Sequence, residues 1–89
     1  MPEISRFFGI VISMIYGDHN PPHFHASYQN FTISVEIVSG IVDGKFPKKE
    51  LKAIFEWLEK NQELLLEDWK LCQEHKQPKP VPPLEKERD

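Results

Sequence analysis

Residues 23–36, which read HFHASYQNFTISVE, decide the fold of this chain. Two stretches of alternating side chains flank the pair Gln29-Asn30, a pattern typical of a β-hairpin closed by a two-residue turn. Directly opposed residues of a hairpin share one face of the sheet, so this turn gathers apolar side chains on one face. The apolar pairs expected there are Tyr28 with Phe31, Ala26 with Ile33 and Phe24 with Val35. We expect that face to pack against the rest of the chain.

The same register places polar side chains on the opposite face. His25 lies opposite Ser34 and His23 lies opposite Glu36, with Cβ atoms about 4.5–5.5 Å apart in such pairs. His23 and His25 are two residues apart on one strand, so they point to the same side. The sequence therefore predicts two imidazoles and one carboxylate on the sheet face that is turned away from the core.

The segments on either side of the hairpin extend the sheet. Residues 5–16 are apolar on both alternating faces, which predicts one long strand in the centre of the sheet. Turn formers at residues 39–40 and 43–44 enclose residues 41–42, where we expect a short fourth strand.

Residues 48–74 carry helix formers without Gly or Pro, after a proline at position 47 that suits a first helical turn. A straight helix of this length would span roughly 40 Å at 1.5 Å per residue, longer than so small a sheet. We therefore expect a kink or break near residues 60–62, with Asn61 as the N-cap of a second helix. The expected buried stripe contains Leu51, Ile54, Phe55, Leu58, Leu65, Trp69 and Cys72. The predicted fold class is α+β: a meander of three or four antiparallel strands with one or two C-terminal helices packed on one face.

The composition indicates one soluble domain. Hydrophobic residues make up 39% of the chain, charged residues 28%, and the net charge is −3, which argues against nucleic acid as a partner. We assign residues 1–76 to the domain and expect residues 77–89, rich in proline and charge, to be disordered.

The single cysteine excludes an internal disulfide. No signal peptide or apolar run long enough for a membrane span is evident, so we expect a cytoplasmic protein.

The histidine-rich segment is the candidate site. Two imidazoles and a carboxylate form a recurrent ligand set for zinc, nickel or iron, here His23, His25 and Glu36. Asp18 or His19, in the preceding turn, offers a further ligand. The same groups also suit proton transfer, with Glu36 orienting His23 as a base. The alternative without chemistry is a turn with polar residues on the protein surface.

Four sequence stretches also resemble a known family. They are MPEISRFFGI at 1–10, DHNPPHFHA at 18–26, GKFP at 44–47 and EDW at 67–69. Together they resemble a family of small bacterial proteins described only as a domain of unknown function, over roughly residues 1–76. The resemblance implies a short cytoplasmic protein, often encoded beside or fused to another small domain in an arrangement like that of toxin–antitoxin modules. It implies no reaction and no catalytic residues.

Two classes of function follow. The first is a partner-binding component of a two-gene, toxin–antitoxin-like module, whose partner is a small protein encoded nearby; assembly with further copies of the chain is left open. The second is a metal- or histidine-dependent hydrolase or nuclease that uses the histidine-rich turn. Bound metal separates the two classes, and the sequence alone does not decide whether the chain is an enzyme.

Overall fold

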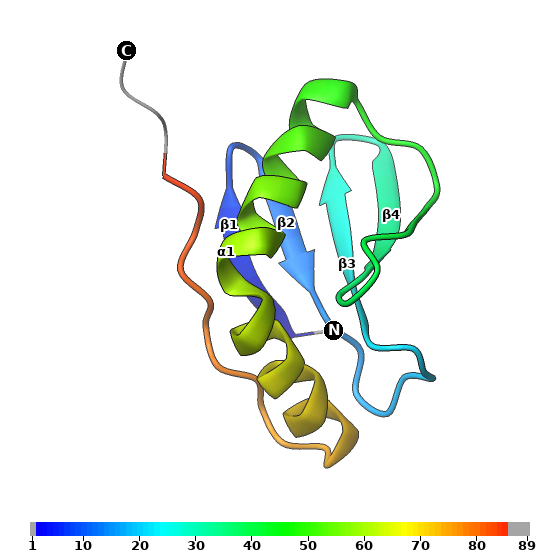
Figure 1. Ribbon diagram of the computed structural model, residues 1–89, viewed down its shortest axis with the longest axis vertical. Coiled ribbons are helices and arrows are strands. Elements are labelled where there is room, and N and C mark those ends of the chain that lie inside the picture. Colours follow the sequence, from blue (N-terminus) through cyan, green and yellow to red (C-terminus); the bar gives the residue numbers. More distant parts are fainter. Residues whose placement is uncertain (1, 86–89) are drawn as a thin grey trace.

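Five short strands pair in chain order to form an antiparallel meander, and one long helix covers a face of the sheet (Figure 1). The computed structural model describes residues 2–85. Its elements are β1 (Glu3–Phe7), β2 (Ile10–Ser13), β3 (His23–Tyr28), β4 (Phe31–Glu36), β5 (Val42–Asp43) and α1 (Lys48–Gln73). The predicted α+β class is confirmed, with five strands in place of three or four.

The β3–β4 hairpin has the predicted register. His23 pairs with Glu36 at one end and Tyr28 with Phe31 at the other, around the turn at Gln29. The face expected to be apolar is buried, and its central members are Phe24, Ala26, Ile33 and Val35. A short strand follows at Val42–Asp43, one residue later than expected, and pairs with β4. The alternation of apolar and polar residues thus determines both the pairing of β3 with β4 and the face of the hairpin that is buried.

The expected single strand over residues 5–16 is wrong. The chain reverses at Phe8 and Gly9, which both have positive φ, at 52° and 80°. Glycine adopts this conformation at little cost, and a Cβ at Gly9 would lie 3.2 Å from the Tyr28 ring. The long apolar segment is therefore a hairpin in which β2 is an interior strand, between β1 and β3, and β1 lies at the sheet edge.

The expected kink is present in α1. Asn61 has non-helical backbone angles (φ −126°, ψ 19°) inside an otherwise continuous helix. Its side-chain amide donates to the carbonyl oxygen of Trp57 at 2.9 Å, so Asn61 satisfies a carbonyl of the preceding turn instead of capping a second helix. Five members of the expected stripe are buried, namely Ile54, Leu58, Leu65, Trp69 and Cys72. Leu51 is only partly buried and Phe55 is 39% exposed, whereas Trp57 and Asp68 are buried without having been predicted. No helix within residues 2–85 is both long and apolar enough to cross a membrane.

The segment after α1 differs from the disordered tail that we expected. Residues 78–85 run back along α1 and β1 (Figure 1). Val81 N–H donates to Ile4 O at 2.8 Å, and Val81 and Leu84 are buried. The edge of β1 offers an unpaired carbonyl that accepts a hydrogen bond, and the core offers an apolar surface that buries two side chains. These two contributions order the segment although most of its residues are polar or proline. The remainder of the predicted tail, residues 86–89, lies outside the described residues.

Candidate functional site at the β2–β3 loop

The loop between β2 and β3, residues 14–22, is attached to the C-terminal end of α1. Gly17 N–H donates to Cys72 O at 3.1 Å, and the side-chain amide of Gln73 donates to Asp18 O at 2.8 Å. The Tyr16 ring stacks on His75 just after the helix. These contacts hold the loop backbone in place, so the side chain of Asp18 has a defined position, within hydrogen-bond distance of His23 at the start of β3.

Three histidines converge on the Asp18 carboxylate. His23 Nε2 lies 2.9 Å and His25 Nε2 3.3 Å from Oδ2. The other oxygen, Oδ1, accepts the backbone N–H of His19 at 2.9 Å and lies 2.9 Å from His19 Nδ1. Asp18 and His23 are mostly buried and His25 is about a quarter exposed, whereas the His19 side chain is 85% exposed. The cluster therefore has a closed side and an open side.

The surroundings of Asp18 favour its ionised form. Burial by itself raises the pKa of this carboxyl. The His19 N–H bond, the His25 bond and the charges of His23 and His19 act in the other direction, and the net result is a pKa below the ordinary value. Asp18 is thus an anionic group that can only accept hydrogen bonds or bind a cation.

The His23 ring has a fixed orientation. Its Nδ1 lies 2.8 Å from Pro21 O, and a carbonyl can only accept, so Nδ1 carries a proton. The ring packs on Trp69 of α1 with centroids 5.1 Å apart. Nε2 therefore faces the Asp18 carboxylate either with a second proton, as an imidazolium, or with its lone pair across a bound cation.

The three ligand atoms have the spacing of a metal site. Asp18 Oδ2, His23 Nε2 and His25 Nε2 all lie within 4.8 Å of one another. Ligands about 2.1 Å from a tetrahedral ion lie about 3.4 Å apart, so a small outward movement would admit an ion. Within residues 2–85 this is the group of histidine and acidic side chains that meets such a spacing.

Glu36, part of the predicted ligand set, has a different role. It pairs with His23 in the register, as predicted, but its side chain accepts a hydrogen bond from Ser39 Oγ at 2.6 Å. Asp18, predicted as an additional ligand, occupies the position between the imidazoles instead. Strand pairing indicates which backbones are opposite, but a long side chain such as glutamate can turn toward a neighbouring loop. His23 also differs from the expected surface position, because Trp69 and the 14–22 loop cover it.

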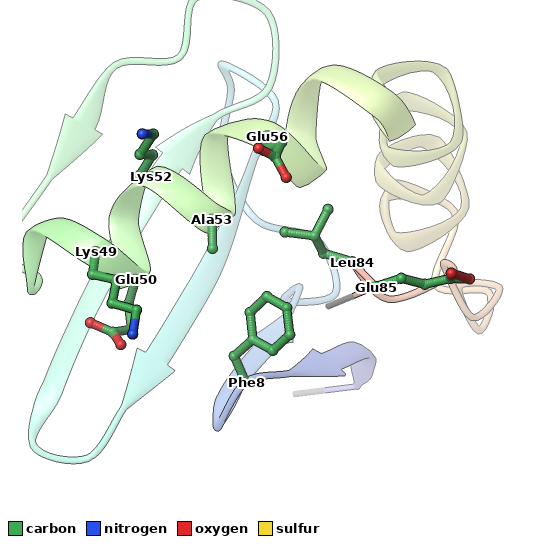
Figure 2. A pocket seen from close by; sticks show the side chains of 8 residues that line it. All are labelled: Phe8, Lys49, Glu50, Lys52, Ala53, Glu56, Leu84 and Glu85. Atoms are coloured by element: carbon green, nitrogen blue, oxygen red, sulfur yellow. The ribbon is translucent and has the colours of Figure 1, made fainter. Parts of the chain in front are cut away.

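A separate hollow of about 530 Å³ lies away from the histidines, between the β1–β2 turn, the first half of α1 and the C-terminal segment. Figure 2 shows Phe8 and Leu84 beneath Ala53, with charged side chains of α1 around them. Its lining residues are Phe8, Lys49, Glu50, Lys52, Ala53, Glu56, Leu84 and Glu85. Charges of both signs surround an apolar floor there, and no histidine lines it.

The fold and the cluster define a small α+β domain with a histidine–aspartate site at one end of its sheet. The chain belongs to the family described as Domain of unknown function (DUF4160), whose profile matches residues 9–70. The match includes the whole 14–22 loop and the strands that carry the cluster. No curated protein and no solved structure matches the chain.

Proposed function

We propose that this protein binds one divalent transition-metal ion, of the zinc, nickel or iron type, through Asp18, His23 and His25. The observation that carries the proposal is the approach of two imidazole Nε2 atoms to a single carboxylate oxygen, at 2.9 and 3.3 Å. Imidazole nitrogen favours transition metals, whereas magnesium and calcium favour oxygen ligands.

The anchoring of His23 supports the same proposal. Histidine ligands of metals commonly donate their second ring N–H to a carbonyl or carboxylate, which fixes the ring and its tautomer. His23 Nδ1 has this arrangement with Pro21 O. Nε2 is then the ring nitrogen that faces Asp18 Oδ2 and is left for an incoming ion. Because a coordinating imidazole nitrogen cannot carry a proton, the ion and protons compete for it, and metal binding should release protons from the site.

Three protein ligands leave a coordination position for water. Structural zinc sites have four protein ligands, whereas catalytic sites have three and keep an open position. The exposed side of His25 gives a route for solvent to that position. A bound water would be acidified enough to act as a nucleophile near neutral pH, which is the chemistry of a metal-dependent hydrolase.

The experiment is metal titration of the untagged, chelator-treated protein by calorimetry in two buffers of different ionisation enthalpy. We expect one zinc or nickel ion per chain, with proton release on binding. Asp18→Asn and His23→Ala should each lower the affinity by at least about 100-fold. Glu36→Gln is a matched control that should bind as the wild type does. Absence of binding, or equal binding by Asp18→Asn, would refute the proposal.

A second candidate is the partner-binding component of a two-protein module. The observation in its favour is a pair of exposed apolar side chains, Val38 and Ile41, at 69% and 61% exposure in the turn before β5. They lie beside the two-residue edge strand, and an exposed sheet edge can pair with a partner. Co-expression with the adjacent gene product should give a stoichiometric complex that melts at a higher temperature. Val38→Ser and Ile41→Ser should weaken it, and a chain that purifies alone would argue against this candidate.

A further inference from the structure

The C-terminal segment shows a three-residue repeat of burial. Every third residue is buried, and the residues between them are exposed. The buried residues are Pro78, Val81 and Leu84, and the exposed ones are Lys79, Pro80, Pro82 and Pro83. A polyproline II helix has three residues per turn, so every third side chain points to the same side. Residues 78–84 therefore present one apolar edge to the groove formed by β1 and α1.

The hydrogen bonds of the segment match this mode of recognition. The indole N–H of Trp57 donates to Pro82 O at 2.8 Å. Val81 N–H donates to Ile4 O, and Lys79 N–H donates to the Asp68 carboxylate, each at 2.8 Å. Aromatic-lined grooves recognise proline-rich ligands by this combination of an apolar contact every third residue and donors to the exposed carbonyls.

An exposed connection joins the segment to α1. Residues 73–77 are all exposed, and His75 has φ 57°, in the left-handed region that favours glycine. His75 N–H donates to Cys72 O and Lys76 N–H to Leu71 O, the pattern of a Schellman motif with histidine in the usual glycine position. The connection is therefore short, solvated and under backbone strain, which are features that favour segment exchange between copies.

We propose that the groove between β1 and α1 is a recognition site for an extended proline-rich segment, and that residues 78–84 of a second copy of this chain can occupy it. The second copy presents the same residues, so every contact of the resident segment is formed again across two chains. Straightening of the connection relieves the strain at His75. The tether keeps the local concentration of the resident segment high, so exchange is expected at high protein concentration. This inference is independent of the metal site.

The test uses two full-length variants that complement each other. Trp57→Phe removes the indole donor from the groove but leaves the segment intact, whereas Val81→Asp damages the segment but leaves the groove intact. When the two are refolded together, the intact segment should enter the intact groove. We expect a mixed dimer by light scattering and by energy transfer between labelled chains, with a melting temperature at least about 4 °C above either variant alone.

The matched control replaces the Val81→Asp partner with a chain that carries both substitutions, which offers no intact groove. It should give no mixed dimer and no rise in melting temperature. A mixture of Trp57→Phe and Val81→Asp that behaves as two non-interacting monomers would overturn the proposal.

A deletion variant gives a second test, which does not depend on whether those two variants fold. Deletion of Lys76 and Gln77 shortens the connection by about 7 Å, so the segment no longer reaches its own groove. We expect a dimer at micromolar concentrations with tryptophan fluorescence, from Trp57 and Trp69 together, like that of the wild type. A folded monomer with red-shifted tryptophan emission would show that the segment does not enter a second copy.

Discussion

Asp18 and Asp68 are both largely buried carboxylates, and their surroundings have opposite effects. Four nitrogen atoms, from His19, His23 and His25, lie within 3.3 Å of the Asp18 oxygens. Asp68, on α1, accepts one hydrogen bond, from Lys79 N–H at 2.8 Å, and its Oδ2 is buried without a partner. Burial is common to the two groups, but only Asp18 has a set of converging donors.

The pKa values of the two carboxyl groups consequently shift in opposite directions. Burial raises the pKa of Asp68, with a further increase from the charge of Glu67, and the single backbone donor only partly opposes this. The pKa of Asp18 is lowered although burial acts on it too. Converging hydrogen-bond donors, and not burial, therefore stabilise the ionised form of a carboxyl group, which is the form that can bind a cation.

The largest effect is expected from Asp18→Asn. The amide has no negative charge and offers a poorer ligand, so zinc or nickel affinity should fall by at least about 100-fold. In the metal-free chain His23 loses its charged acceptor, which should reduce the free energy of unfolding by about 1–2 kcal/mol. Calorimetric titration and urea unfolding in chelator measure the two effects. A variant that retains wild-type affinity would show that the carboxylate is not a ligand.

His23→Ala and His25→Ala should differ in the metal-free chain. His23 is buried against Trp69 and bonded to Pro21 O, so its removal leaves a cavity and an unpaired carbonyl and should cost about 2 kcal/mol. His25 is more exposed, and its removal should cost about 0.5 kcal/mol. Urea unfolding in chelator gives both values. Equal losses in the free energy of unfolding would mean that His23 does not lie on the closed side of the site and His25 on the open side.

Asp68→Asn should change the pH dependence of stability. Because the pKa of Asp68 is raised in the folded chain, the folded state keeps a proton that the unfolded state releases above about pH 4. The wild type therefore loses stability as pH rises from there toward the raised pKa, and the amide does not. We expect the variant to be about 1 kcal/mol more stable at pH 7 and equal to the wild type below pH 4. Parallel curves of unfolding free energy against pH would contradict this.

The alternation of apolar and polar residues predicted the β3–β4 hairpin, because one face of that hairpin is apolar and the other polar. The β3–β4 register and its buried face follow from residues 23–36 because a one-residue slip would expose every apolar side chain. The β1–β2 hairpin was missed because residues 5–16 are apolar on both faces and give no preferred register. Gly9 was the available signal, since an isolated glycine within a strand pattern often marks a reversal or bulge.

The candidate site was predicted in part for a related reason. His23 and His25 are two residues apart on one strand, so their shared face follows from the sequence alone. The position of Asp18 depends on how the 14–22 loop attaches to Cys72 and Gln73, residues more than fifty positions away. The packed C-terminal segment was missed because its apolar residues recur every third position, a period that helix and strand patterns do not contain.

The smallest effect is expected from Glu36→Gln, which tests whether Asp18 has replaced the cross-strand carboxylate as the ligand. Glu36 accepts a hydrogen bond from Ser39, and the glutamine carbonyl oxygen can accept the same bond. Stability should therefore change by less than about 0.5 kcal/mol. Metal affinity should stay within about twofold of the wild type, because the Glu36 side chain is turned toward the β4–β5 turn. A tenfold loss would mean that Glu36 moves to the ion when it binds, and that the ligand set inferred from strand pairing is formed only in the metal-bound state.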